Sequence, residues 1–293
     1  MTHASSPPDR KGEVIGGRYK ILGELGRGGQ GAVYRARDLR DGDEVAVKVL
    51  SVPAQREDEW RERMLREAHA LTVLSTTAAV RIVHQAWADD GSFCLVTELL
   101  QGVDLQDYLE AREARGERME IPALIELLGP VVATLESAHA AGILHRDLKP
   151  RNIFVLDSGG VRLLDFGFAK FTRMRRLTQA GLIAGSPSYI APEIWSGASH
   201  FDHRIDVYSF GALLFRALGA QTPFSGEGMQ EILRIVTTAE RPSLHALRPD
   251  LPAAIDDWVQ HALAIEPEHR FERVQAMWNA LKGLGAAQTP VEP

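Results

Sequence analysis

Two hydrophobic patterns follow one another along the chain and change near residue 100. From about Tyr19 to Glu98 the apolar residues come in short β-branched runs separated by turn signals, which is typical of strands. From about Leu105 onward they recur at helical spacing. Helices are predicted over residues 122–141, 205–219, 228–239 and 253–264. Strands followed by helices, not alternating with them, indicate an α+β fold in two lobes.

The strand-rich part contains three clear runs and one helical interruption. Strands are predicted for AVYRAR at 32–37, EVAVKVL at 44–50 and FCLVTEL at 93–99. Segment 57–74 instead places Met64, Ala68 and Leu71 near one face, so an amphipathic helix is predicted there.

The two ends of the chain differ in composition from the middle. Residues 1–14 are polar around a Ser-Ser-Pro-Pro run and are expected to form a disordered leader, and residues 285–293 a flexible tail. The domain between them, 15–284, is expected to comprise an N-lobe over about 15–98 and a C-lobe over about 103–284.

Composition and charge favour a soluble globular protein. Hydrophobic residues make up 45% of the chain and charged residues 25%, enough for a sizeable core. The net charge of −6 gives no indication of a nucleic-acid partner. Cys94 is the only cysteine and lies in an apolar run, so we expect it to be buried and unpaired.

No segment is expected to span a membrane. The first residues contain no apolar signal-peptide core, and no apolar run approaches about 18 residues. The most apolar stretch, 121–135, is interrupted by Glu126 and Pro130 and is predicted to be a core helix. A cytoplasmic location is expected.

The first motif with chemical content is a glycine-rich loop. Gly26, Gly28 and Gly31 match the spacing G-x-G-x-x-G, in which backbone N–H groups can approach phosphate oxygens. A Rossmann fingerprint has the same spacing but leads into a helix. Here the loop continues as the strand at 32–37, which favours a hairpin folding over a nucleotide.

Lys48 ends a β-branched strand and would ordinarily be a solvated residue. An ammonium that binds α- and β-phosphates must be held in position, and Glu67 on the predicted helix could hold it. The alternative for Glu67 is a surface residue paired with Arg63 at helical spacing.

The most specific signal is His-Arg-Asp-Leu-Lys-Pro-Arg-Asn at 145–152, followed by Leu-Asp-Phe-Gly at 164–167. Phosphoryl transfer needs a carboxylate that orients the attacking hydroxyl and accepts its proton, and Asp147 fits this role. Asn152 and Asp165 fit the role of oxygen ligands for Mg²⁺. Lys149 is placed to offset charge on the transferred group. Any one acidic residue would more often be a cap or turn residue, but both motifs in this order after Lys48 argue against that.

With these motifs the chain resembles eukaryotic-type serine/threonine protein kinases, most of all the bacterial members, from about Tyr19 to Leu284. Ala-Pro-Glu at 191–193 and Asp-Val-Tyr-Ser-Phe-Gly at 206–211 add to the resemblance. It implies a bilobal fold, with a small antiparallel β-sheet N-lobe carrying one main helix and a larger, mainly helical C-lobe. It also implies a Glu193–Arg270 ion pair and an Asp206 that braces the catalytic loop.

The resemblance implies a site for ATP with Mg²⁺ or Mn²⁺. The adenine would lie between Val33, Ala46 and Phe154, with Leu25 above it. Thr97 would be the gatekeeper, followed by a hinge whose backbone binds the adenine edge, and Asp104 would meet the ribose. The hinge residues would be Glu98, Leu99 and Leu100. Ordinary core packing is the alternative for the apolar members, and the two interpretations are compatible.

The same resemblance favours Ser/Thr hydroxyls of proteins as acceptors. Lys149 follows the catalytic Asp by two residues, as in Ser/Thr kinases, and Gly185-Ser186 matches a contact point of that class. Arg151 is an unusual residue between Pro150 and Asn152 and is a candidate for tuning substrate choice.

Regulation is expected in the segment between Asp165 and Glu193. A phosphate there could bind Arg146, which precedes the catalytic Asp. Among the hydroxyls of this segment we favour Thr178, close to the basic run 173–176, with autophosphorylation in trans through a transient homodimer. The basic run could instead be solvated loop surface or recruit an acidic substrate.

Two other functions compete with this hypothesis. A pseudokinase scaffold usually lacks one of three residues that are all present here, Lys48, Asp147 or Asp165. A small-molecule kinase of related fold lacks the Ala-Pro-Glu segment, which is also present.

Overall fold

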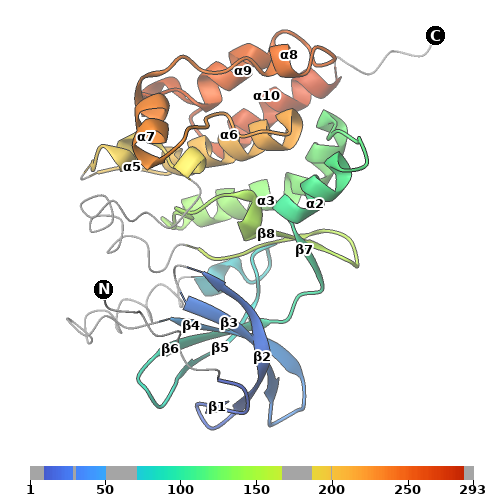
Figure 1. Cartoon of the computed structure of the whole chain (residues 1–293), viewed down its shortest axis with the longest axis vertical. Helices are drawn as coiled ribbons and strands as arrows, with labels where there is room; N and C mark the ends of the chain where they lie inside the picture. The colour runs from blue at the N-terminus through green and yellow to red at the C-terminus, as the bar shows by residue number, and fades with distance from the viewer. Residues whose placement is uncertain (1–9, 29–30, 51–70, 167–186, 199, 287–293) are drawn as a thin grey trace. The chain divides into compact units, whose positions relative to one another are not determined.

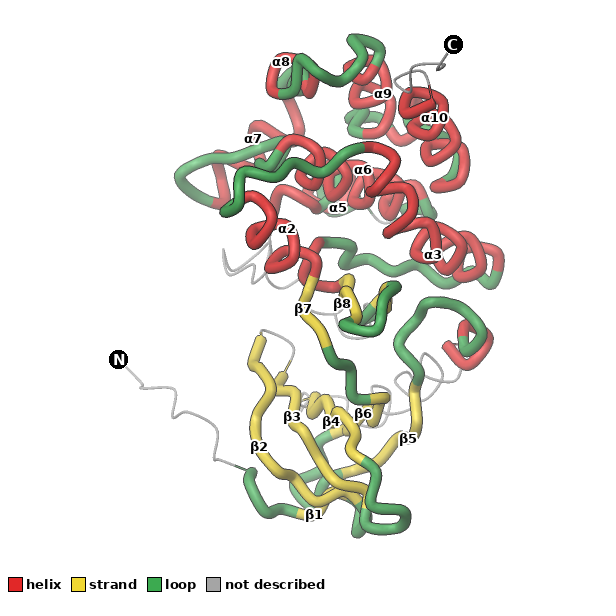
Figure 2. The backbone as a smooth tube through the Cα atoms, turned by 90° about the vertical axis from the view of Figure 1, so that its right-hand side faces the viewer, coloured by secondary structure: helices red, strands yellow, loops and turns green. Residues whose placement is uncertain are grey.

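The structure is a computed structural model, and it describes residues 10–28, 31–50, 71–166, 187–198 and 200–286. The chain divides into two compact units. The N-terminal unit comprises Met1–Ser75 and Val80–Leu100, and the C-terminal unit comprises Thr76–Ala79 and Gln101–Pro293. Their elements are drawn in Figures 1 and 2.

The N-terminal unit is built on an antiparallel sheet with the order β1-β2-β3-β4-β6-β5. Its strands are β1 Val14–Ile15, β2 Tyr19–Gly28, β3 Gly31–Asp38, β4 Glu44–Leu50, β5 Ile82–Trp87 and β6 Phe93–Glu98. The three predicted strands are confirmed as β3, β4 and β6. Of the helix predicted over 57–74, only Leu71–Leu74 lie within the described residues. They form a short 3-10 helix, η1, and not the last α-helical turn.

Strict alternation along β4 separates the two faces of this sheet. Val45, Val47 and Val49 are buried in the core, whereas Ala46 and Lys48 lie on the other face. Cys94 on β6 belongs to the same core and is 0% exposed, as predicted. Burial raises the pKa of its thiol to about 12, because the thiolate would be poorly solvated.

The C-terminal unit combines a three-stranded antiparallel sheet with a set of helices. The strands are β7 Gly102–Asp104, β8 Ile153–Leu156 and β9 Val161–Leu163, in the order β7-β8-β9. The α-helices are α2 Leu105–Glu113, α3 Ile121–Ala140, α5 Pro192–Trp195, α6 Arg204–Gly219, α7 Met229–Thr238, α8 Leu244–Leu247, α9 Ile255–Ala262 and α10 Val274–Ala286. Short 3-10 helices are η2 Pro150–Asn152, η3 Pro187–Tyr189 and η4 Pro267–His269. The four predicted helices are confirmed as α3, α6, α7 and α9.

Helices α3 and α6 carry the core of this unit. Every residue of α6 from Ile205 to Gly219 is buried. Within the described part of the chain, α3 is long and apolar enough to cross a membrane. Its apolar side chains, including Leu124, Leu128 and Val132, are instead buried inside the unit. This is the core helix that the sequence predicts.

The predicted ends of the domain fall inside ordered elements. Val14 already belongs to β1, and before it the Gly12 N–H donates to the Ile21 carbonyl at 2.9 Å. These backbone bonds attach the chain from Arg10 onward to the sheet, so the predicted leader boundary at residue 14 lies too late. At the other end, α10 extends to Ala286 and includes the first two residues of the predicted tail.

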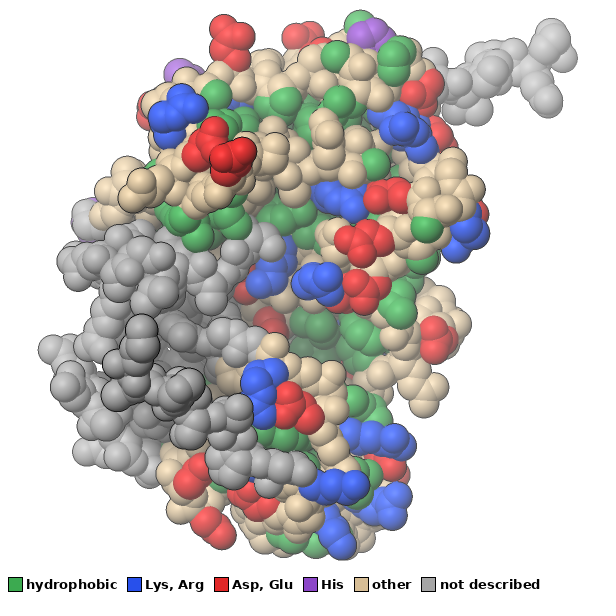
Figure 3. Space-filling model, viewed as in Figure 1, with side chains coloured by type: hydrophobic (Ala, Val, Ile, Leu, Met, Phe, Trp, Pro, Cys, Tyr) green, Lys and Arg blue, Asp and Glu red, His purple; other side chains and the backbone are tan. Residues whose placement is uncertain are grey.

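On the face shown in Figure 3, Lys and Arg side chains lie interspersed with Asp and Glu side chains and do not gather into one basic patch.

Candidate active site

A buried carboxylate from α6 holds the loop that contains the predicted catalytic residue. Asp206 accepts hydrogen bonds from the backbone N–H groups of His145 and Arg146, each at 2.8 Å. The His139 side chain lies 2.8 Å from the same carboxylate. Burial alone would raise the pKa of Asp206, but the hydrogen bonds from His139 and the loop backbone outweigh it and lower this pKa. Asp206 is therefore an ionised brace for the loop.

His145 connects this loop to the Leu164–Phe166 segment. Its Nε2 lies 2.8 Å from the Leu164 carbonyl oxygen, and its ring packs against Phe166 with centroids 4.8 Å apart. Full burial lowers the pKa of the His145 imidazole, since the charged ring would lack solvation. A neutral His145 therefore bridges the two motifs.

Two residues of these motifs have left-handed backbone conformations. Arg146 has φ 64° and Asp165 has φ 51°. Such a conformation costs a non-glycine residue roughly 1–3 kcal/mol and persists only where the surroundings impose it. The bonds of Asp206 and His145 on either side impose it here, together with the Leu164 N–H donating to the Asn152 carbonyl at 2.8 Å.

These constraints bring three predicted site residues together. Lys149 Nζ lies 3.2 Å from Asp147 Oδ2, and the Asn152 amide nitrogen donates to the Asp147 carbonyl oxygen at 2.7 Å. Because the Asn152 nitrogen is used in this bond, its side-chain oxygen is the atom suited to a cation. Asp147 thus lies between a cationic side chain and an amide.

The residues present fit a hard cation such as Mg²⁺. Among the described residues no group of three or more His, Cys, Asp or Glu could hold a metal ion. Asn152 and Asp165 would instead supply one amide and one carboxylate oxygen, as expected for Mg²⁺ that keeps water and phosphate oxygens as further ligands.

The N-terminal unit gathers the predicted nucleotide residues on one face of its sheet. Lys48 on β4 is directly opposite Val33 on β3, and Ala46 is opposite Thr97 on β6. Directly opposed residues share a face, and alternate residues of a strand do so too. The four residues therefore lie together on the face away from the buried valines of β4.

The glycine-rich loop begins at the end of this face. Gly31 has φ 142°, and a Cβ there would lie 2.0 Å from the Val49 carbonyl oxygen, so only glycine fits. Gly28 pairs with Gly31, and Gly26 pairs with Val33 with open space where its Cβ would be. Leu25 is 52% exposed, which leaves its side chain accessible to a ligand.

Residues 19–280 match the family model described as the protein kinase domain. The chain belongs to the protein kinase family. It is 32% identical over 285 residues to the serine/threonine-protein kinase PknL of Mycobacterium tuberculosis, an alignment that covers 97% of this chain and 70% of PknL. It is 34% identical to the probable serine/threonine-protein kinase PknB of Lactococcus lactis and 30% identical to PrkC of Bacillus subtilis. This kinase spans 42% and 40% of the lengths of those two relatives.

Solved structures agree with this assignment. The kinase domain of PknI from M. tuberculosis superposes with a TM-score of 0.73 at 26% identity, covering 94% of this chain and 98% of that one. The predicted enzyme class, serine/threonine protein kinase, and the similarity to bacterial members are confirmed by these relatives.

The kinase also contains the ion pair implied for the Ala-Pro-Glu segment. Both carboxylate oxygens of Glu193 lie 2.7 Å from guanidinium nitrogens of Arg270. The Arg270 side chain is 0% exposed and donates in addition to the carbonyl groups of Ala264, Ile265 and Arg204. This buried pair anchors α5 to the end of the domain.

Two residues that are predicted to contact the nucleotide, Asp104 and Glu98, make hydrogen bonds within the protein. Asp104 caps α2 by accepting from the Asp107 N–H at 2.9 Å, and Arg151 Nη1 donates to its other oxygen at 3.0 Å. The Glu98 N–H donates to the Arg81 carbonyl at 3.0 Å. Contacts of Asp104 with ribose and of the hinge with adenine, including partly exposed Leu100, stay predictions.

Phe154 on β8 lies opposite Asp104 on β7, in the C-terminal unit. Glu67 and Thr178 lie outside the described residues, so the Lys48–Glu67 pair and the phosphorylation site also stay predictions.

Two long-range polar pairs in and near this site could not be found from the sequence. His139 is 67 residues from its partner Asp206, and Arg216 is 103 residues from its partner Glu113. No local motif marks either pair. The one available signal is that His139 lies near the end of the predicted helix 122–141, shortly before the catalytic motif.

Proposed function

We propose that this kinase transfers the γ-phosphate of Mg-ATP to Ser or Thr hydroxyls of protein substrates. The observation that carries the proposal is the braced loop, in which Asp206 and His145 hold Asp147, Lys149 and Asn152 in one cluster. A site whose work is positioning and charge stabilisation requires such preorganisation.

Each residue has a separate task in the proposed reaction. The Asp147 carboxylate accepts a hydrogen bond from the attacking hydroxyl and takes its proton as the new P–O bond forms, while the bond between the γ-phosphorus and the bridging oxygen breaks and ADP leaves. Lys149 offsets negative charge on the transferred group. Asn152 and Asp165 would hold the metal ion, which when bound supplies charge neutralisation for the phosphates.

The N-terminal unit is proposed to bind the nucleotide through one face of its sheet. Lys48 would contact the α- and β-phosphates, with Glu67 as its proposed partner. Val33 and Ala46 offer small apolar surface to an adenine ring, which is consistent with their shared face. Backbone N–H groups of the glycine-rich loop would cover the phosphates.

Phosphate transfer from radiolabelled Mg-ATP to a basic and an acidic generic protein tests the proposal. The wild type should label at least one of them, and an Asp165→Asn variant should bind nucleotide but label neither. Nucleotide binding without any transfer by the wild type would favour a pseudokinase scaffold. Transfer to metabolites alone would favour a small-molecule kinase.

We further propose autophosphorylation of Thr178 between two copies in a transient homodimer, in the cytoplasm. The Arg-rich run before Thr178 and the position of Arg146 support this proposal. Phosphopeptide mapping of active enzyme should find phosphate on Thr178, and wild type should label a catalytically dead copy. Fully active enzyme without phosphate on Thr178 would contradict it.

A further inference from the structure

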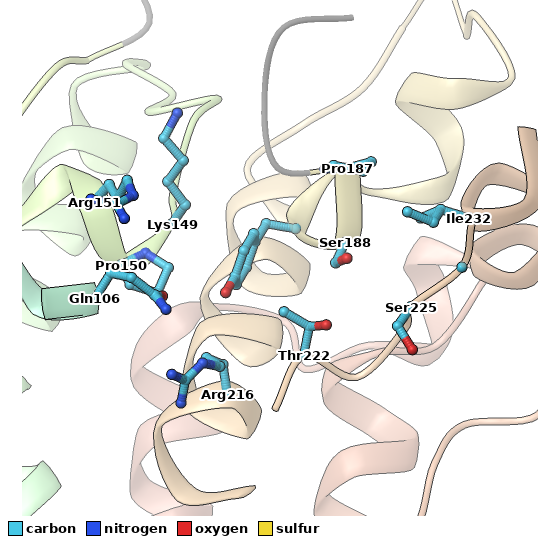
Figure 4. Close-up of a pocket in the computed structure, with 12 residues that line it drawn as sticks. Gln106, Lys149, Pro150, Arg151, Pro187, Ser188, Arg216, Thr222, Ser225 and Ile232 are labelled. Carbon is cyan, nitrogen blue, oxygen red and sulfur yellow. The ribbon is translucent and has the colours of Figure 1, made fainter. Parts of the chain in front are cut away.

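A pocket of about 450 Å³ lies beside the catalytic loop, within the C-terminal unit. Figure 4 shows Lys149, Arg151 and Arg216 on one side of it and Pro187, Ser188 and Ile232 on the other. The remaining lining residues are Gln106, Pro150, Tyr189, Thr222, Ser225 and Gly226. Three cationic side chains thus line the pocket, and none of the twelve lining residues that the structure describes is acidic.

Arg216 is the most constrained of the three cations. It is 5% exposed, and the two oxygens of Glu113 on α2 lie 2.5 and 3.0 Å from its Nη1 and Nη2. This fork uses two of the five N–H groups of a guanidinium, and the plane of the group is fixed by it. A rigid cation with further donors, open to a pocket in an otherwise buried setting, is suited to bind a carboxylate.

Other lining groups define the rest of the pocket. Ser188 and Thr222 donate to the Phe224 carbonyl at 2.7 and 3.1 Å, so these two hydroxyls shape the wall. Burial raises the pKa of the Tyr189 phenol to about 12, which keeps it protonated and able to donate.

The cations of the pocket are already partly neutralised. Lys149 contacts Asp147, and Arg151 contacts Asp104 and Asp107. Long-range attraction of an anion is therefore weak here, and recognition must come from short hydrogen bonds made inside the pocket.

We infer that this pocket binds a carboxylate side chain of the substrate polypeptide, with Arg216 as the residue that determines this preference. The inference rests on the proposed function. Lys149 both lines the pocket and contacts Asp147, so a polypeptide that presents its hydroxyl to Asp147 brings its neighbouring residues to the pocket. Acceptors with a nearby Asp or Glu are therefore the preferred substrates.

The chain itself contains a threonine with basic neighbours, which serves as a comparison for acidic acceptor peptides. Thr178 is preceded by Arg173, Arg175 and Arg176, so a peptide of this segment should be a poorer acceptor than the same peptide with glutamates in their place. Autophosphorylation between paired copies depends less on this preference, because pairing raises the effective concentration of the acceptor.

Steady-state phosphorylation of a positional peptide set tests the inference. One alanine-rich acceptor peptide is compared with versions that carry Glu, Leu or Lys at each position from five before to three after the acceptor. With the full chain, Glu at one or more positions should raise kcat/KM about tenfold over Ala, the effect expected of one charge-assisted hydrogen bond. A preference for Leu would show an apolar pocket formed by Pro187 and Ile232 and would overturn the inference.

A charge exchange identifies Arg216 as the cause. The double variant Arg216→Glu with Glu113→Arg keeps an internal ion pair while it reverses the sign at the pocket. Its ratio of Glu-peptide to Lys-peptide kcat/KM should reverse, whereas the same exchange at the exposed pair Arg115 and Glu117 should leave the ratio unchanged. An unchanged ratio in the first exchange would overturn the assignment. Absence of transfer to every peptide would instead refute the proposed function itself.

Discussion

The catalytic loop and the nucleotide face of the N-terminal sheet achieve the same end by different physical means. Around Asp147, buried polar bonds from Asp206, His145 and Asn152 hold a strained backbone. On the sheet, Val33, Ala46 and Lys48 share a face because of strand register alone. Loss of one buried polar group should therefore disrupt the catalytic loop. Substitution of a core residue on the opposite face of the sheet should leave the nucleotide face in place.

The largest effect is expected from Asp206→Ala. The substitution leaves the buried N–H groups of His145 and Arg146 without acceptors, which should cost roughly 2–5 kcal/mol of unfolding free energy. Released strain at Arg146 should also displace Asp147, so kcat should fall by more than 100-fold at temperatures where the variant stays folded. Denaturant unfolding and initial rates measure the two effects.

The exposed carboxylate Asp202, which accepts from the Arg204 N–H at the start of α6, is the control: Asp202→Ala should leave kcat near wild type and cost only about 1 kcal/mol of unfolding free energy. Normal kcat in folded Asp206→Ala would contradict the bracing role.

Removal of Glu193 should have the next largest effect, on stability. Glu193→Ala leaves the buried charge of Arg270 without its carboxylate partner, which typically costs about 3–5 kcal/mol. Removing Glu117 from its exposed pair with Arg115 should cost about 0–1 kcal/mol. Thermal unfolding of both variants compares the loss of a buried pair with the loss of an exposed pair. Equal decreases in Tm would show that the Glu193–Arg270 pair is not desolvated.

Neighbouring residues of β4 should separate ligand binding from stability. Ala46→Leu adds volume on the nucleotide face and should weaken ATP binding about tenfold, with little change in unfolding free energy. Val47→Ala removes buried methyl groups and should cost about 2 kcal/mol, with little change in the Kd for ATP. Calorimetric titration of each variant measures the Kd for ATP, and denaturant unfolding measures its stability. A loss of stability in Ala46→Leu together with weaker ATP binding in Val47→Ala would show that the two faces are misidentified.

The smallest expected effect is a pH dependence from His145. Burial lowers its folded pKa below the ordinary value of 6.5, so the unfolded chain binds the extra proton first as the pH falls. This contribution to stability is complete above about pH 6.5 and is lost as the pH falls toward the folded pKa. Unfolding free energy should decrease from pH 7 to pH 5.5, and less steeply in His145→Gln. A wild-type stability that rises over this range would contradict the buried neutral imidazole.

The same contrast explains what the sequence could predict. Strands β3, β4 and β6 and helices α3, α7 and α9 follow from periodicity, since each buries mainly one face or one stripe, whereas α6 is buried on all sides and follows from its run of apolar residues. The residues of the catalytic motifs follow from their order and spacing. The contact of His139 with Asp206, which supports the loop, and the Arg216–Glu113 fork between α6 and α2 do not, because each joins positions that only the tertiary fold brings together.

The structural role of Asp104 could not be predicted from the sequence either. The resemblance predicts that Asp104 meets the ribose, and the structure adds that it caps α2 and pairs with Arg151. Helix capping depends on where the helix begins, and the sequence gives that boundary only approximately.

The central claim is that Asp147, held in the braced loop, accepts the proton of the attacking hydroxyl. The most direct measurement is kcat for peptide phosphorylation by Asp147→Asn, alongside its Kd for Mg-ATP and its unfolding free energy. Loss of the base should lower kcat roughly 10³-fold while nucleotide affinity and stability stay near wild type. Phosphorylation at an undiminished rate by this folded variant would contradict the account.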